Sequence, residues 1–362
     1  MILDSTRKHK QKEESEMAVP VRGLHLYPSR WNDPYGAKFA SDRDKINAIG
    51  NLNSVKITLF SYMNHYEQGP IPSYALYTEL RGGPTGMRTR QEQKISTIRQ
   101  ISGLPGNATY LFRCWPEEGV KQPWDQMYDP GAPGDFVQIM TGEIDYYESG
   151  RQFAHNLLQP LTVIQNLGIP YVLLEVANEP NHPNEPFGQS MAHYNDFFRG
   201  FYYGQQEINF SYPLVYAGLS GDNPSAWYQD YWVQYHIREF ASKVGVHCYW
   251  NNGKLESEDP DGGRYYRWVK RTLQAAGVGP KGIQVTEFNI ARDLVNNDAM
   301  AQIYQCRDWW RGFYNDALSG YWCEQGYIFV SNADPDWSLP DPYYYINCFQ
   351  ITDSQLPIIR DA

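Results

Sequence analysis

The stretch YVLLEVANEPNHP, residues 171–183, decides the fold of this chain. It begins as an apolar run that is typical of a buried strand, and it ends in polar residues and prolines. Because Pro180 cannot donate a hydrogen bond to a sheet ladder, we expect the strand to end there. The carboxylate of Glu179, between Asn178 and Pro180, is therefore predicted to lie at the rim of a larger structure.

Eight segments share this β-branched and aromatic character, and helical stretches separate them. The predicted strands are 22–28, 54–62, 108–115, 171–178, 213–219, 243–250, 282–290 and 326–332. Strands that alternate with helices indicate a parallel sheet with helical crossovers. Eight such units predict an α/β fold, a single closed (β/α)8 TIM barrel. The alternative is an open doubly wound sheet, but no Gly-rich dinucleotide fingerprint follows the first strand.

The helical stretches and the long loops fill the intervals between the strands. The predicted helices are 42–52, 90–102, 149–168, 191–208, 225–242, 262–277 and 297–318. The aromatic-rich segments 227–236 and 307–316 are expected to pack mostly against the barrel wall. Long loops are expected over 63–90, 116–136 and 251–263, after strands, at the face where a barrel carries its active site.

The two ends of the chain and its hydropathy bear on domains and location. Residues 1–17 are charged and lack apolar periodicity, so we expect a disordered N-terminal tail before a single barrel domain over 18–362. The N-terminus has no apolar h-region, so no secretory signal is predicted. The location stays open between the cytoplasm, release by a non-classical route and a phage particle. No apolar run is long enough to predict a membrane span.

Composition narrows the class of partner. The net charge of −10 and the pI of about 5.3 come without a marked basic patch, so nucleic acid is not expected as a partner. The five cysteines show no metal-binding spacing, so free thiols and no metal are expected, with one disulfide left open. Aromatic residues make up 15% of the chain, which fits either an aromatic-rich core or a groove for a flat, hydroxylated ligand.

A second carboxylate stands at another predicted strand end. Glu287 lies in QVTEFNI, residues 284–290, where a lone ionised group is costly unless it is paired or hydrogen-bonded. Its strand and that of Glu179 are three units apart, so the two side chains are expected to face each other across the barrel mouth. Such a pair is the machinery of glycosidic bond hydrolysis. The alternatives without a catalytic role are a surface carboxylate for Glu179 and a buried structural ion pair for Glu287.

Other polar and aromatic side chains are candidates for binding a sugar at this rim. Alternation places His247 and Tyr249 on one face of their strand, with Cys248 on the other. Glu175 shares a face with Glu179 but lies deeper, and a structural salt bridge is expected for it. The further candidate substrate-binding residues are Asn178, His25, Arg113, Trp115 and Trp337.

The segments LLEVANEPN and IQVTEFN resemble the paired signatures of clan A glycoside hydrolases, which include families 5 and 39. The resemblance spans about residues 18–350, and its specificity lies in these motifs and in the HxY of residues 247–249. It implies that Glu179 is the acid/base and Glu287 the nucleophile. It also implies that Asn178 contacts the sugar 2-hydroxyl and helps to position Glu287. The Arg that the family carries on its second strand is not evident, and Arg113 on the third is a candidate substitute.

These features predict a retaining glycoside hydrolase that cleaves β-glycosidic bonds in an oligo- or polysaccharide by double displacement, without a cofactor. Carbohydrate is the expected partner, and the long loops slightly favour endo-action. A catalytically silent carbohydrate-binding barrel within a larger assembly is the alternative. A metal-dependent barrel hydrolase is less favoured, because no His-x-His follows the first strand.

Overall fold

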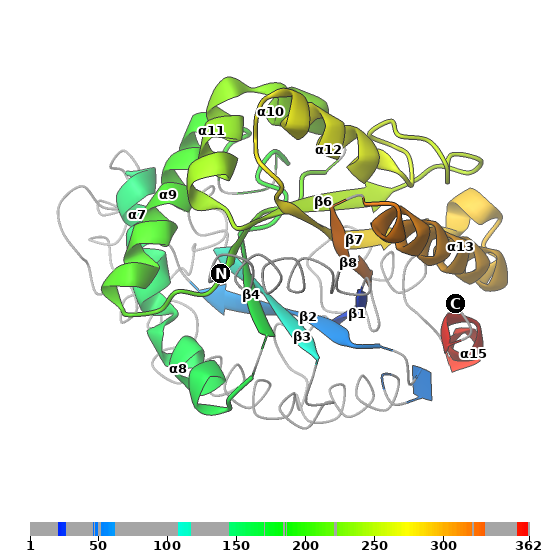
Figure 1. Cartoon of the computed structure of the whole chain (residues 1–362). Coiled ribbons are helices and arrows are strands. Elements are labelled where there is room, and N and C mark those ends of the chain that lie inside the picture. The colour runs from blue at the N-terminus through cyan, green and yellow to red at the C-terminus, as the bar shows by residue number, and fades with distance from the viewer. Residues whose placement is uncertain are drawn as a thin grey trace, which may run out of the picture.

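The parallel strands of the chain close into a barrel, β1 to β8 in chain order, as predicted (Figure 1). The computed structural model describes residues 21–26, 46, 48–49, 52–61, 108–116, 145–169, 171–183, 185, 187–220, 223–320, 322–329 and 353–360. The strands are β1 (Val21–Leu26), β2 (Ser54–Ser61), β3 (Thr109–Pro116), β4 (Tyr171–Val176), β5 (Leu214–Tyr216), β6 (Lys243–Tyr249), β7 (Gly282–Asn289) and β8 (Cys323–Ile328). The predicted (β/α)8 architecture is thereby confirmed.

Helices follow one another around the outside of the barrel (Figure 1). The α-helices are α7 (Tyr146–Asn156), α8 (Leu158–Asn166), α9 (Met191–Glu207), α10 (Pro224–Gln229), α11 (Tyr231–Phe240), α12 (Tyr265–Ala275), α13 (Ala299–Leu318) and α15 (Leu356–Arg360). Two 3-10 helices are η2 (Arg292–Val295) and η3 (Asp353–Gln355). The predicted helix 90–102, the predicted loop 63–90 and all of the predicted loop 116–136 except Pro116, which ends β3, lie outside the described residues.

Two predicted helices are each a pair of helices. The stretch 149–168 belongs to α7 and α8, which separate at Leu157. Pro160 lacks the N–H that would continue the hydrogen-bond ladder across this point. The stretch 225–242 divides into α10 and α11 at Asp230, whose backbone is extended and whose carboxylate accepts from the N–H groups of Trp232 and Val233. Helical periodicity alone did not reveal these breaks.

The last strand begins three residues earlier than predicted. Sequence alone favoured 326–332, because Glu324 and Gln325 interrupt the apolar pattern. In the structure Cys323 pairs with Ile283 of β7, and Gln325 pairs with Gln284. The carboxylate of Glu324 binds Lys243 at 2.5 Å, so the polar residues lie at the N-terminal ends of the strands, away from the predicted site.

The core has an outer and an inner part. Outside the barrel, the rings of Phe288 and Trp309 stack at 3.9 Å between β7 and α13. Inside it, a smaller apolar cluster fills the lower layer with Leu111, Leu173, Val215 and Tyr327. This inner cluster fills the barrel toward the N-terminal ends of its strands, so the site is expected at their C-terminal ends.

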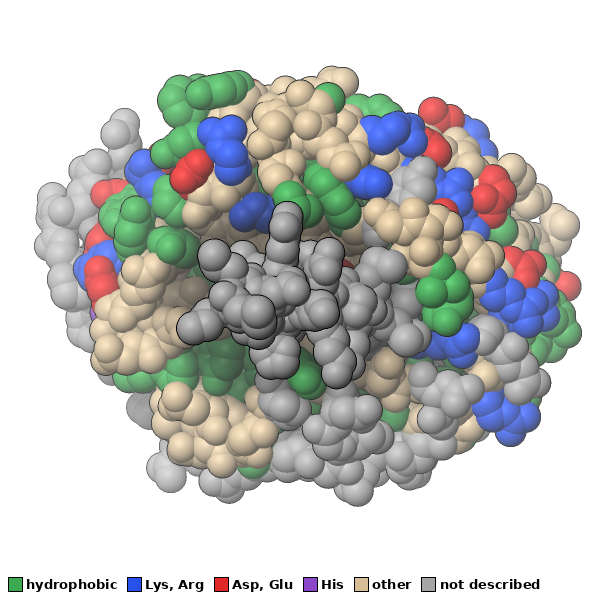
Figure 2. Space-filling view, in the orientation of Figure 1, with side chains coloured by type: hydrophobic (Ala, Val, Ile, Leu, Met, Phe, Trp, Pro, Cys, Tyr) green, Lys and Arg blue, Asp and Glu red, His purple; other side chains and the backbone are tan. Residues whose placement is uncertain are grey.

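The aromatic-rich helices were predicted to pack against the barrel wall. This holds for Trp309, Trp310 and Trp227, which are buried. It is wrong for Tyr231 and Trp232 in the first turn of α11, whose exposed fractions are 64% and 61%. Figure 2 shows hydrophobic side chains gathered over the part of the surface where Figure 1 places α11.

The described residues also bear on thiols and membranes. Four cysteines, Cys114, Cys248, Cys306 and Cys323, are buried free thiols, as expected, and Cys348 lies outside the described residues. Among the helices that the structure describes, none combines the length and the apolar character that a bilayer crossing requires.

Candidate active site

Glu179 reaches the barrel mouth through a sharp bend after β4. Ala177 and Glu179 have φ angles of 71° and 37°, in the left-handed region that residues with a side chain seldom adopt. The Glu179 N–H donates to the carbonyl of Gly218 at 3.1 Å, and the Ala177 N–H donates to that of Cys114 at 2.8 Å. These bonds to the neighbouring strands hold a strained conformation, which is a common property of functional sites.

Glu287 reaches the same space because of an irregularity in β7. Val246 of β6 pairs with Val285, yet His247 pairs with Glu287, so Thr286 is an extra residue without a partner on β6. Bulges of this kind re-aim side chains and are frequent beside active sites. The bulge brings Glu287 level with His247.

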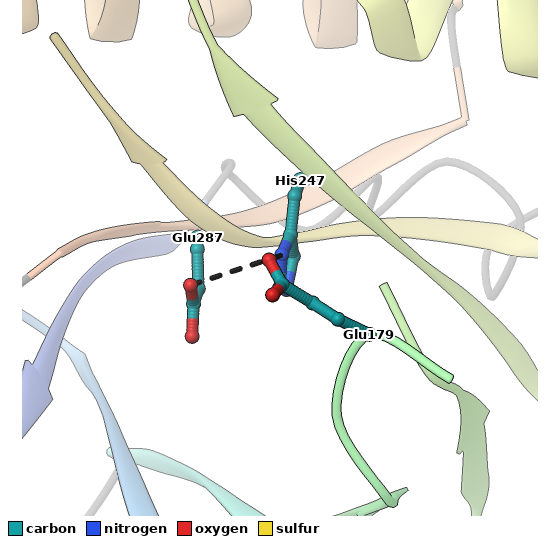
Figure 3. A group of neighbouring side chains, drawn as sticks. All are labelled: Glu179, His247 and Glu287. Carbon is teal, nitrogen blue, oxygen red and sulfur yellow. Dashed lines mark hydrogen bonds and ion pairs between the residues drawn. The ribbon is translucent and has the colours of Figure 1, made fainter. Parts of the chain in front are cut away.

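The carboxylates of Glu179 and Glu287 meet at His247 (Figure 3). One donor atom from each of the three side chains lies within 4.8 Å of the others. His247 Nδ1 lies 2.7 Å from Glu179 Oε1 and 3.7 Å from Glu287 Oε2. Strands four and seven therefore place their carboxylates face to face, as the sequence predicted.

Hydrogen-bond donors and cations surround Glu287. Tyr249 donates its hydroxyl to Oε2 at 2.6 Å. The other oxygen, Oε1, contacts the guanidinium of Arg113, and it lies 3.4 Å from Lys56 Nζ and 3.5 Å from His25 Nδ1. The side chain of Glu287 is only 5% exposed. Donors and positive charge at this density favour the ionised form of the carboxyl group.

A second charged group lies beneath Glu287. Glu175 is fully buried and binds Lys56 Nζ at 2.8 Å and Arg113 Nε at 3.5 Å. Burial alone would raise the pKa of Glu175, but the two cations outweigh it and lower the pKa to about 2. The salt bridge that the sequence predicted for Glu175 is confirmed, and it lies directly under the proposed pair.

Glu179 is in a different environment. Its side chain is 19% exposed, and His247 is its close partner. Burial opposes ionisation, but the hydrogen bond from His247, together with the charges of His247, His182 and Arg113, lowers the pKa of Glu179. Burial also lowers the pKa of His247, in spite of the carboxylate beside it. A neutral His247 with its proton on Nδ1 can donate to Glu179 when that carboxyl group is ionised.

His25 and Arg113 were expected at the rim as substrate-binding residues. The structure corrects their position: both are buried and lie under Glu287. Burial, with Arg113 and Lys56 nearby, lowers the pKa of His25 well below its usual range, so its ring is neutral. Arg113 lies three residues before the end of β3 and pairs with Glu175 of β4, whereas His25 is the last residue but one of β1 and pairs with Lys56 of β2.

Of the three other predicted substrate-binding residues, the structure describes the side chain of Asn178 alone. Asn178 is buried beside Glu179, and its side-chain amide donates to Glu185 Oε1 at 3.4 Å. Trp115 belongs to β3, but its side chain is not among the described ones, and Trp337 lies outside the described residues. A role for these three residues in binding a sugar stays a prediction.

Sequence reasoning missed two residues that shape the site. Lys56 was read only as part of a strand, although a lysine inside SVKITLF is a signal, because a buried ammonium needs a counter-ion. Gly218 was also missed. Its N–H donates to Glu175 Oε1 at 3.3 Å, and a Cβ there would overlap the His247 ring.

Glu179, His247 and Glu287 have the donor types and the spacing of a metal site. The charges around them oppose such an assignment. Arg113 and Lys56 already contact Glu287, and a third positive charge beside them would be repelled. The arrangement fits a pair of carboxylates that work with protons better than it fits a metal.

Comparison with solved structures finds the same barrel in glycoside hydrolases. A family 5 mannosidase from Rhizomucor miehei is similar over 95% of this chain and 92% of its own, with 12% identity and a TM-score of 0.52. A glucosidase from Croceicoccus marinus matches 95% of this chain and 67% of its own, with 9% identity and a TM-score of 0.56. A family 39 enzyme from Xanthomonas axonopodis pv. citri matches 86% of this chain and 62% of its own, with 12% identity and a TM-score of 0.50.

The sequence itself matches no protein-family model and no curated protein. At these identities the structural likeness concerns the fold. The chain therefore has the TIM-barrel fold that clan A glycoside hydrolases use, including enzymes of families 5 and 39.

Proposed function

We propose that this protein is a retaining glycoside hydrolase that cleaves β-glycosidic bonds in an oligo- or polysaccharide. The observation that carries the proposal is the meeting of Glu179, Glu287 and His247, with one donor atom of each within 4.8 Å. Retaining enzymes hold their two carboxyl groups about 5–5.5 Å apart, whereas inverting enzymes need about 6.5–9.5 Å to seat a water molecule. The short spacing favours retention.

The surroundings of the two carboxylates assign their roles. Glu287 is nearly buried among Tyr249, Arg113 and Lys56, which suits a nucleophile that must stay ionised. Its Oε2 faces His247 and Glu179, so this oxygen is the one that attacks the anomeric carbon. Glu179 is partly exposed at the mouth, where it can protonate the departing oxygen and later take a proton from water.

Two chemical steps follow from these roles. In the first, Glu287 Oε2 bonds to the anomeric carbon, the glycosidic C–O bond breaks, and Glu179 gives its proton to the leaving oxygen. In the second, water attacks the same carbon, the ester bond to Glu287 breaks, and Glu179 takes the proton of the water. Two displacements at one carbon give net retention.

The mannosidase and glucosidase among the similar structures suggest which substrates to try first. We expect turnover on a panel of aryl β-mannosides and β-glucosides and on the corresponding polysaccharides. Proton NMR of the first-formed product is expected to show the β-anomer before mutarotation. An α-anomer would contradict double displacement, and sugar binding without turnover would favour the silent barrel.

Variants separate the two roles. Glu287→Ala is expected to lose activity on every substrate by several orders of magnitude. Glu179→Ala is expected to lose activity on natural glycosides but to keep the first step with dinitrophenyl glycosides, whose leaving group needs no proton. If Glu179→Ala affects both kinds of substrate equally, the acid/base assignment is wrong.

A further inference from the structure

Lys56 lies inside the barrel between two carboxylates and has no exposed surface. Its Nζ is 2.8 Å from Glu175 Oε2 and donates to Glu287 Oε1 at 3.4 Å. A third bond, at 3.0 Å, goes to the carbonyl of Thr286, the extra residue of the β7 bulge. The ammonium is therefore fixed against the strand that carries the proposed nucleophile.

Charged and titratable groups face this ammonium from most of the other strands. They are His25 of β1, Arg113 of β3, Glu175 of β4, Glu179 just after β4, His247 of β6 and Glu287 of β7. Burial lowers the pKa of both histidines, so they are neutral near pH 7. Within this group the positive charge rests on Lys56 and Arg113.

The two cations differ in one chemical respect. An arginine guanidinium does not lose its proton in proteins. Burial, with Arg113 close by, lowers the pKa of Lys56 to about 7, although Glu175 acts in the opposite direction. Lys56 is therefore the cation of this cluster that changes its charge near neutral pH.

We propose that protonated Lys56 stabilises the carboxylate of Glu287 as it leaves the sugar in the second step, and that loss of the Lys56 proton limits this step at alkaline pH. The inference rests on the proposed function. When the ester bond breaks, its electron pair stays on Glu287, and negative charge develops 3.4 Å from the ammonium. Lys56 keeps its proton throughout, and the proton of the attacking water goes to Glu179.

The second step isolates Lys56 from Glu179. In this step Glu179 acts as a base and must be ionised, so raising the pH only favours its working form. An alkaline limit cannot then come from Glu179, whereas the first step loses its acid when Glu179 ionises. Substrates with a dinitrophenolate leaving group make the second step limiting, so their kcat reports on it.

The experiment measures kcat for a dinitrophenyl β-glycoside between about pH 5 and 10 in four proteins. For the wild type we expect kcat to fall at least about tenfold above a break near pH 7, the order of magnitude of a lost charge-assisted hydrogen bond. In Lys56→Arg this alkaline limb, the fall in kcat above about pH 7, should disappear, because a guanidinium keeps its charge. A wild-type kcat that is flat above pH 7, or a Lys56→Arg profile with the wild-type limb, overturns the inference.

Two further variants sharpen the result and cover a Lys56→Arg protein that does not fold. Glu175 raises the pKa of Lys56, so Glu175→Gln is expected to move the limb to lower pH, opposite to the effect of Lys56→Arg. Lys243→Arg is the matched control. Like Lys56, Lys243 lies on a strand and pairs with a glutamate, Glu324, but it is the first residue of β6, at the other end of the barrel. It should leave the limb unchanged. An unmoved limb in Glu175→Gln contradicts the proposal.

A measurement without substrate separates this inference from the proposed function. Lys56 binds its proton less tightly when folded, so between about pH 7 and 10 the unfolded chain holds more protons and stability rises with pH. Lys56→Arg lacks this gain, so the difference in urea midpoint between wild type and variant should grow across that window. If the difference in urea midpoint stays constant across this window, Lys56 does not titrate there and the inference is refuted. If the difference grows but the protein turns over no β-glycoside, only the proposed function is refuted.

Discussion

Glu179 and Glu287 are the same kind of residue and face the same space, yet their contacts differ. Arg113 and Tyr249 hold Glu287 at both of its oxygens, and the side chain is 5% exposed. Glu179 depends on His247 and is 19% exposed. These environments suit the different tasks that we propose for the two side chains: Glu287 is nearly buried among cations, whereas Glu179 is exposed enough to reach a leaving group or a water molecule.

His247 controls the proton of Glu179. Its hydrogen bond is the largest influence that lowers the pKa of Glu179 against burial, so His247→Leu should raise that pKa. Glu179 then keeps its proton to higher pH, and the falling limb of kcat/KM on natural glycosides should move up by about one pH unit. His247→Asn is the control, because its amide can donate from a similar place. A limb that stays fixed in His247→Leu would contradict this account.

Tyr249 holds Oε2 of Glu287, the oxygen that we propose attacks the sugar. Its hydroxyl donates to Oε2 at 2.6 Å, so Tyr249→Phe removes one donor and keeps the ring. We expect kcat/KM to fall about 10- to 100-fold, the value of a hydrogen bond to a charged group, with little change in the urea midpoint. Tyr265→Phe, whose hydroxyl lies 3.2 Å from Ser225, is the control and should keep full activity. Equal activity in both variants would exclude Tyr249 from positioning Glu287.

At the scale of elements, the residues just after β5 bind the site together. Gly218 accepts from the Glu179 N–H, donates to Glu175, and leaves room for the His247 ring. The segment just after this short strand, without any proposed catalytic side chain, thus contacts three residues of the site. Its contribution is the close approach of a backbone, which only glycine allows here.

Gly218→Ala is expected to displace His247, since the new methyl group would overlap the imidazole and Thr286 Oγ1. Activity should fall at least about tenfold, with a loss of stability of about 1–3 kcal/mol, as for other overpacked sites. Rates and urea unfolding of the purified variant measure both effects. Gly279→Ala is the control, because a Cβ there meets nothing within 4 Å. Wild-type rates in Gly218→Ala would show that His247 tolerates the shift.

At the scale of the whole molecule, the barrel interior has two layers of opposite character. Apolar side chains and Tyr327 fill the lower layer, and charged groups fill the upper one. Buried ion pairs are costly to break, because each partner left alone is an uncompensated charge. Stability and the proposed activity therefore depend on the same buried groups.

This coupling predicts how stability changes in acid. The pKa of Glu175 is about 2 in the folded protein, against about 4.3 in an unfolded chain. Below about pH 4.3 the unfolded chain takes up the proton first, so the stabilisation that Glu175 contributes is lost as the pH falls toward 2. Urea midpoints at about pH 5 and 3 should differ less in Glu175→Gln than in the wild type. Glu239→Gln, at an exposed ion pair, is the control and should behave as the wild type.

The sequence by itself determined the barrel and its pair of carboxylates. Eight strand patterns alternate with helical ones, and this order depends on local periodicity, which a chain carries in its own residues. The end of β4 was also readable, because Pro180 stops a strand whatever surrounds it. Glu179 and Glu287 followed from these strand ends, and their meeting in space agrees with that prediction.

Only the tertiary structure decided what lies under and beside that pair. The β7 bulge at Thr286 exists only when β6 lies alongside, so alternation within one strand could not place Glu287 level with His247. Lys56, Arg113 and Glu175 come from three strands, and their ion pairs form only when the closed barrel brings those strands together. The charge on each group depends on burial and on neighbours distant in sequence, and these are properties of the folded barrel.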